Sequence, residues 1–247
     1  MAQRPTGTSN SNSGSVQDSL HKVLYTKSID QSGWLAIRVD EGIVTVPEFV
    51  KVSGVGTKDR RYYFTVLEGR YKGKLASLKG EYKERCLISS TRGAGAKLVA
   101  KIQGRKLLHS DKRGDSSNQL LAVLYFDGKK ATITLDSDVD FREFDSQTRQ
   151  EIGIKHSKPL PKGTYKIRAP EAAGSASATA FYGVNYHTVW FLVEYAPTNY
   201  SNFVHVGHLS EGCVTMYQLE MWESLYKYLI SNRLDAEGKY VGVIAIE

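Results

Sequence analysis

The chain has 247 residues, of which 41% are hydrophobic and 24% are charged, and its formal net charge is +7. This composition predicts a globular protein with room for one or two domains. Its core is expected to be large enough to be stable without disulfides or structural metals. Two cysteines, Cys86 and Cys213, are too few for a disulfide scaffold, and no apolar stretch is long enough to span a membrane.

The N-terminal tail, residues 1–15, is rich in Ser, Asn and Gly and contains no apolar segment. We predict that it is disordered and that it is not a secretory signal peptide. A protein of this kind that acts outside the cytoplasm needs another route of delivery.

Residues 16–90 have the pattern of a small β domain. Short segments rich in β-branched and aromatic residues alternate with turn residues, such as 40–42 and 54–56, which favours a small barrel or sandwich. This domain contains no motif that indicates a particular ligand, so the sequence assigns it no role. The strands are expected at 34–39, 42–46, 62–66 and 73–77.

Residues 91–116 form a strongly basic segment that we interpret as a connector between domains. A solvated linker is the favoured interpretation, and contact with an anionic polymer or membrane surface is the alternative. The segment contains no aromatic residue, which argues against stacking on nucleic-acid bases. Between Arg92 and Arg113 only Asp111 opposes its cations, which are Arg92, Lys97, Lys101, Arg105, Lys106, Lys112 and Arg113.

Residues 117–247 form the C-terminal domain, which is also predicted to be mainly β. It opens with a hairpin whose turn is Asp127-Gly128, a strong signal for a two-residue turn. Apolar residues at three- and four-residue spacing predict one amphipathic helix over 217–231. The remaining strands are expected at 120–126, 131–135, 164–168, 188–195, 203–207 and 238–246, with a loop over 172–180.

The segment 203–216 carries the residues best suited to chemistry. Strand alternation places Val204 and Val206 on one face and His205 on the other, so His205 is a candidate base for the thiol of Cys213. Gly212 allows a tight turn whose amides hold an oxyanion. Because the helical period begins at 217, Cys213 is expected where a loop enters the helix, and a helix N-terminus favours the thiolate.

Other polar residues near this segment leave alternatives open. His208 is a rival base, and Glu211 is either a group that orients a histidine or an ordinary solvated carboxylate. His187 is a weak candidate for distant support of the site. A zinc site built from His205, His208 and Cys213 lacks an obvious fourth ligand, so we expect no metal and no cofactor.

The order of these motifs resembles the catalytic domain of L,D-transpeptidases, the cysteine enzymes that act on peptidoglycan stem peptides. A Y-x-D-G hairpin, a G-T-Y strand, a V-H-x-G strand, S-x-G-C-V, a helix and a valine-rich strand follow one another within residues 119–247. The resemblance implies a β-sandwich with the helix beside the cysteine loop. It also implies that Cys213 is the nucleophile, His205 its base, and Gly212 and Cys213 the oxyanion amides, with Ser210 at the family's hydroxyl position.

The chain departs from that family at three points. Glu211 replaces the histidine of the S-H-G-C signature, and Thr215 replaces an arginine, which puts recognition of a substrate carboxylate in doubt. The interval between His205 and Cys213 is also short, so the loop between them must be reduced.

The resemblance implies an acyl-enzyme mechanism in which a Cys213 thioester with a stem peptide is resolved by an amine or by water. The protein would then be a transferase or a hydrolase of the cell wall that acts at the cell envelope or periplasm, and a delivered effector is one form that such a protein takes. The alternative is a non-catalytic protein that binds cell wall or another anionic polymer on a transpeptidase-like scaffold. Peptidoglycan is therefore the expected partner, and nucleic acid is not favoured.

Overall fold

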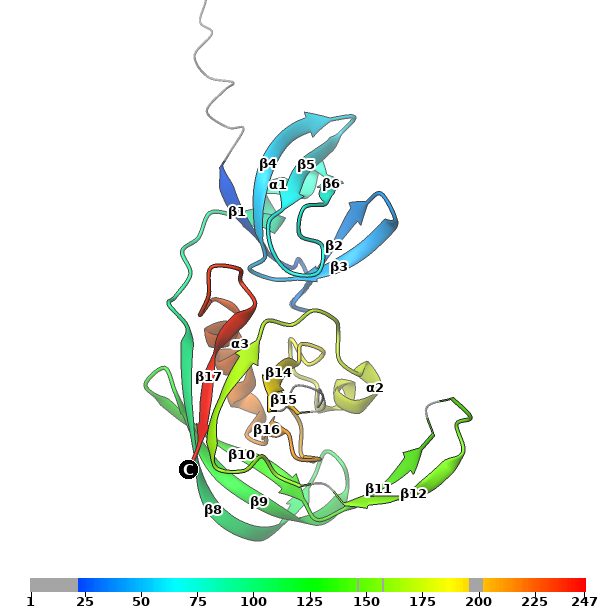
Figure 1. The fold of residues 1–247 in the computed structure, drawn as a ribbon, viewed down its shortest axis with the longest axis vertical. Helices are drawn as coiled ribbons and strands as arrows, with labels where there is room; N and C mark the ends of the chain where they lie inside the picture. The colour runs from blue at the N-terminus through cyan, green and yellow to red at the C-terminus, as the bar shows by residue number, and fades with distance from the viewer. Residues whose placement is uncertain (1–21, 146, 157, 196–201) are drawn as a thin grey trace, which may run out of the picture.

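The computed structural model describes residues 22–145, 147–156, 158–195 and 202–247, and the tail predicted at 1–15 lies outside them. The fold is mainly β, as predicted, with two large sheets, one small hairpin and only short helices (Figure 1). No helix in the described part of the chain is both long enough and apolar enough to cross a membrane.

The N-terminal domain is one antiparallel seven-stranded sheet in the order β3-β2-β6-β5-β4-β1-β7. The turn predicted at 54–56 is wrong, because this segment continues strand β4 and absorbs an irregularity between Gly54 and Gly56. Two short helices, η1 (Gly80–Tyr82) and α1 (Lys83–Cys86), precede the last strand. The strands are β1 (Val23–Thr26), β2 (Trp34–Val39), β3 (Gly42–Pro47), β4 (Lys51–Lys58), β5 (Arg61–Val66), β6 (Leu75–Lys79) and β7 (Leu87–Ile88).

The C-terminal domain is a closed barrel in the order β10-β16-β15-β14-β13-β17-β8-β9, where a β-sandwich was expected. The sheet closes because β8 pairs with β9 on one side and with β17 on the other. Its strands are β8 (Ala96–Ser110), β9 (Asp115–Phe126), β10 (Lys129–Ser137), β13 (Gly163–Arg168), β14 (Phe191–Glu194), β15 (Phe203–Val206), β16 (Val214–Met216) and β17 (Tyr240–Ile246).

The basic connector predicted at 91–116 is wrong. Most of it is strand β8, in which Ala96, Leu98 and Ala100 are buried while Lys97 and Lys101 are exposed. The lysines at 97 and 101 therefore belong to the solvent-facing half of an alternating strand. The C-terminal domain consequently begins near residue 96 and not at 117.

The helix α3 (Trp222–Ile230), preceded by η3 (Leu219–Met221), confirms the main part of the predicted helix. Its apolar face, including Trp222, Leu225 and Leu229, is fully buried in the same hydrophobic core as the barrel strands. The other elements are α2 (Ala176–Thr179), η2 (Ala180–Tyr182), and the hairpin of β11 (Asp140–Phe144) and β12 (Glu151–His156), which projects from the barrel (Figure 1).

The two domains are joined by buried contacts. The indole Nε1 of Trp34, a residue of the N-terminal sheet, donates a hydrogen bond of 3.1 Å to Thr188, and its ring belongs to the barrel core. The carboxylate of Glu48 is buried and accepts hydrogen bonds from the hydroxyls of Ser28 and Tyr226. A buried charge with these partners ties the N-terminal sheet to α3.

Candidate catalytic site

The candidate site is built on the parallel strand pair β15 and β16, in which Val204 lies opposite Val214 and His205 lies opposite Thr215. Both valines are fully buried in the barrel core. Because side chains alternate along a strand, His205 and Cys213 share the opposite face of this pair. The alternation predicted for His205 is therefore confirmed.

His205 and Cys213 line one cavity of about 930 Å³. Its walls are largely aromatic, and the rings of Phe181, Tyr182, Trp190, Tyr195 and Phe203 contribute to them. Its charged residues are Arg113, Lys158 and Glu211. A large cavity with apolar walls and a few polar groups is the usual form of a small-molecule or substrate site.

The imidazole of His205 is held in one tautomer by its neighbours. Nδ1 lies 3.0 Å from the carbonyl oxygen of Val206, which can only accept, so Nδ1 carries the hydrogen. Nε2 then accepts from the hydroxyl of Thr215 at 3.2 Å. The lone pair that a base needs is therefore on Nε2, where it accepts the hydrogen bond from Thr215 in the resting protein.

The ring of His205 is also covered by Trp190, whose indole stacks on it with centroids 4.6 Å apart. Burial lowers the pKa of His205 to about 4. The imidazole is therefore neutral near pH 7, the form in which it can accept a proton.

Cys213 is 6% exposed, and its Sγ accepts a hydrogen bond of 3.4 Å from the backbone N–H of Phe203. Burial, opposed by the Phe203 amide and aided by the carboxylate of Glu211, raises the pKa of the Cys213 thiol to about 12. The predicted helix N-terminus at Cys213 is wrong, because strand β16 follows it directly. The resting group is consequently a thiol without help from a helix dipole.

The loop before Cys213 is shaped by Gly212 and Ser210. Gly212 has φ +87°, and a Cβ there would lie 2.2 Å from the carbonyl oxygen of Lys158. The carbonyl of Gly212 accepts from the Asn202 side chain at 2.9 Å. The hydroxyl of Ser210 donates to the carbonyl of Cys213 at 2.7 Å. Gly212 and Ser210 thus fix the backbone around the thiol, while oxyanion binding by amides here stays a prediction.

His208 is directed away from the cavity. Its Nδ1 lies 2.6 Å from the hydroxyl of Ser110, and its ring stacks on Tyr217 with centroids 4.3 Å apart. The structure therefore does not bring the rival base to Cys213, nor does it gather the three ligands of the zinc alternative. Among the described residues no group of three His, Cys, Asp or Glu side chains is placed to hold a metal ion.

His187 reaches the site indirectly. Its carbonyl accepts a hydrogen bond of 3.1 Å from the indole Nε1 of Trp190, which stacks on His205. Its own Nδ1 lies 3.0 Å from the hydroxyl of Thr179, a cavity residue. This arrangement fits the predicted role of distant support.

No protein-family model, curated protein or solved structure matches this chain. The site therefore has to be interpreted from its own geometry.

Three residues that shape the site were not singled out for it from the sequence. Trp190 lies in an apolar run that predicts only a buried strand, and Asn202 lies in a polar segment without a motif. Thr215 was noted only as a replacement for arginine, yet it is fully buried against the basic nitrogen of His205. The sequence did carry a signal for Thr215: in a strand, Cys213 and Thr215 lie on one face and Val214 lies on the other.

Proposed function

We propose that this protein is a cysteine acyltransferase or peptidase that forms a thioester with peptidoglycan stem peptides. The observation that carries the proposal is the common placement of Cys213 and His205 on one face of a parallel strand pair, lining one cavity. A thiol and a neutral imidazole facing the same cavity are the minimum needed for acyl transfer from an amide. The resemblance in motif order supports the choice of substrate.

In this mechanism the thiol of Cys213 attacks an amide carbonyl while its proton passes to Nε2 of His205. His205 lies opposite Thr215 on the paired strands, and Cys213 is two residues before Thr215. The thiol and the imidazole therefore start one pleat repeat apart, about 7 Å along the strand. The thiol must therefore leave the Phe203 amide and turn toward the imidazole when substrate binds, as catalytic contacts often tighten only in the complex.

The tetrahedral intermediate then collapses. The hydroxyl of Thr215 accepts a hydrogen bond from Nε2–H of protonated His205 until this proton passes to the leaving amine and the thioester forms. Backbone amides near Cys213 hold the oxyanion, each donor contributing about 3 kcal/mol to the transition state. An amine or water then attacks the thioester and gives its proton to Nε2 of His205, which returns it to the departing sulfur of Cys213. An amine acceptor gives cross-linking and exchange, and water gives hydrolysis. Such a reaction takes place at the cell envelope.

The test is mass spectrometry of muropeptides after incubation with the purified protein. Wild type should change the muropeptide pattern, and Cys213→Ala should not, while Cys86→Ala should behave as wild type. Cys86 is a matched control because it is a buried free cysteine in the other domain. An unchanged pattern with wild type, or an equal change with Cys213→Ala, would refute the proposal.

A non-catalytic wall-binding protein is the second candidate, and the burial of both reacting groups favours it. With a pKa of about 12 for Cys213 and about 4 for His205, the free protein holds no thiolate–imidazolium pair. Retention of the Cys213→Ala variant on sedimented cell wall, without product from wild type, would support this second function.

A further inference from the structure

The candidate catalytic cavity continues beyond its aromatic wall. Trp190 and Phe203 also line a second cavity of about 380 Å³ on their other side, next to the segment 168–174. Residues 168–171 in turn line a third cavity of about 250 Å³ at the junction of the two domains. Each cavity shares lining residues with the next, so the three lie in a row that marks a path from Cys213 to the N-terminal domain, with the side chains of Trp190 and Phe203 between the first two.

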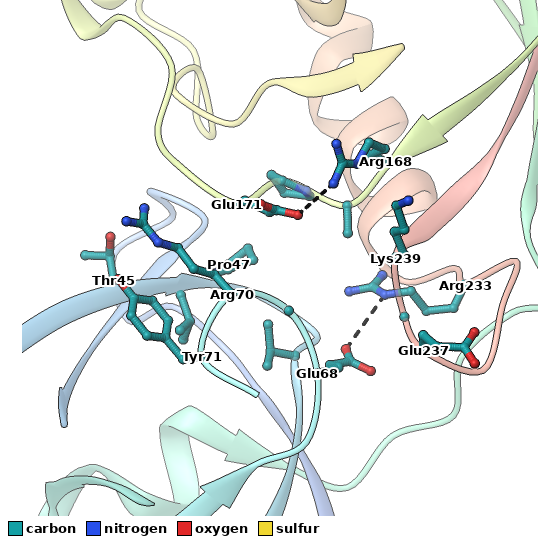
Figure 2. Close-up of a pocket in the computed structure, with 16 residues that line it drawn as sticks. Thr45, Pro47, Glu68, Arg70, Tyr71, Arg168, Glu171, Arg233, Glu237 and Lys239 are labelled. Atoms are coloured by element: carbon teal, nitrogen blue, oxygen red, sulfur yellow. Dashed lines mark hydrogen bonds and ion pairs between the residues drawn. The ribbon is translucent and has the colours of Figure 1, made fainter. Parts of the chain in front are cut away.

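The far end of this path is positively charged. Figure 2 shows Arg168 and Lys239 of the barrel on one side of the junction cavity, with Thr45, Arg70 and Tyr71 of the N-terminal domain across from them. Arg168 and Lys239 are brought side by side because the amide of Ala169 donates to the carbonyl of Lys239 at 2.8 Å.

A buried charge cluster behind the cavity adds to this field. Arg92 and Arg233 are both close to the carboxylate of Glu68, and Arg233 and Glu68 also line the cavity. Arg233 and Glu68 are each only 4% exposed at the side chain. Two guanidinium groups share this carboxylate, and Asp235 is a second carboxylate near Arg233, so the cluster keeps both cations charged beside the cavity.

The acidic residues around the cavity do not cancel its cations. Three carboxylates line the cavity, those of Glu68, Glu171 and Glu237. The carboxylate of Glu171 pairs with Arg168 at 3.2 Å. Among the lining residues, Arg70, Arg168, Arg233 and Lys239 thus face three carboxylates, with Arg92 behind them. Charge complementarity therefore points to an acidic occupant.

We infer that the substrate is an extended acidic strand that runs from Cys213 past Trp190 and Phe203 to the domain junction, where Arg168 and Lys239 bind one of its carboxylates. This inference rests on the proposed function and makes the strand a peptidoglycan chain with carboxylate-bearing stem peptides. It also gives the N-terminal domain a role, since that domain forms one wall of the distal subsite.

The experiment compares the double variant Arg168→Gln/Lys239→Gln with the control Glu171→Gln, which removes a charge of opposite sign from the same cavity. Two substrates are used: a short free stem peptide and intact peptidoglycan stripped of phosphate polymers. The double variant should lose about tenfold in kcat/KM on the polymer, since a charged hydrogen bond is worth about that factor. Its turnover of the short peptide should stay within about twofold of wild type, and Glu171→Gln should not weaken polymer turnover.

Binding is measured separately by sedimentation of polymer with each variant in the Cys213→Ala background, after equal thermal midpoints show that all of them fold. A tenfold weaker retention of the double variant is expected. Equal loss on both substrates, or unchanged polymer turnover and retention, would overturn the inference. If wild type turns over neither substrate but retention still depends on Arg168 and Lys239, the catalytic proposal fails and the distal subsite stands.

Discussion

The hydroxyl of Thr215 donates a 3.2 Å hydrogen bond to Nε2 of His205, the one imidazole nitrogen that can act as a base. The family that the motif order resembles has an arginine at the position of Thr215. Here the side chain is short, fully buried and turned to the histidine. It therefore fixes the imidazole and leaves any substrate carboxylate to residues elsewhere in the cavity.

Replacing Thr215 with Val removes this hydrogen bond while keeping the shape of the side chain. We expect kcat on stem peptides to fall about tenfold, because the imidazole loses the partner that orients it and later accepts a hydrogen bond from Nε2–H. The free energy of unfolding should fall by about 1 kcal/mol, the net value of a typical hydrogen bond. The measurement is steady-state kinetics together with urea unfolding.

Thr215→Ser is the matched control for this variant, because it keeps the hydroxyl and removes the methyl group. It should recover most of kcat. If Thr215→Val and Thr215→Ser lose activity equally, the methyl group and not the hydrogen bond is what matters.

The two cysteines should differ in their reaction with iodoacetamide. Both cysteines line cavities, but Cys213 is 6% exposed whereas Cys86 has no exposed surface in the core of the N-terminal domain, so Cys213 should be labelled first. Because the pKa of Cys213 is raised to about 12, its labelling rate should rise about tenfold for each pH unit between pH 7 and 9.

Single-cysteine proteins carrying Cys86→Ala or Cys213→Ala separate the two rates, and mass spectrometry identifies the labelled residue. A rate for Cys213 that levels off below pH 8 would mean that a thiolate is already populated, contrary to the burial of the thiol. Equal and slow labelling of both residues would count against an accessible nucleophile.

The sequence predicted the elements whose patterns are local. The Asp127-Gly128 turn joins β9 to β10 with both residues at positive φ, and the amphipathic period of α3 marks a face that is fully buried. These features depend on residues that are near one another in the chain, so short windows reveal them.

Features that depend on distant pairing were missed or misplaced. Strand β8 was taken for a linker because its exposed half is basic, although Ala96, Leu98 and Ala100 alternate with that half. Its pairing with β17, which closes the barrel, joins segments more than a hundred residues apart. The element after Cys213 was also misjudged, since β16 is too short to show a period of its own before the helix.

His205 should make the protein less stable in acid. Its pKa of about 4 in the folded protein lies below the value of about 6.5 expected in the unfolded chain, so between these values the unfolded state binds more protons. The stabilisation is complete above pH 6.5 and is lost as the pH falls toward 4. A shift of this size corresponds to about 3 kcal/mol of the free energy of unfolding.

Urea unfolding of wild type and His205→Asn at pH 4 and pH 7 measures this effect. Other groups titrate in the same range, so the quantity to compare is the difference between the two proteins at each pH. Wild type should have the larger free energy of unfolding at pH 7, and this advantage over His205→Asn should shrink or reverse at pH 4. If it is the same at both pH values, His205 is not the buried neutral base that its surroundings indicate.

Gly212→Ala should damage both the fold around the site and its activity. Gly212 has φ +87°, where an L side chain is strained, and its new Cβ would lie 2.2 Å from the carbonyl oxygen of Lys158. Backbone atoms cannot move aside as the end of a flexible side chain can, so the loop before Cys213 must shift. We expect a loss of about 2 kcal/mol in the free energy of unfolding and at least a hundredfold loss of kcat.

Gly183→Ala is the matched control, because Gly183 also has a positive φ but its added Cβ would meet no atom within 4 Å. It should share the backbone strain without the clash and retain most of the activity. If Gly212→Ala is no more harmful than Gly183→Ala in unfolding and kinetics, the contact with Lys158 does not position the thiol. In that case the nucleophile must be held mainly by the hydrogen bonds of Ser210 and Asn202.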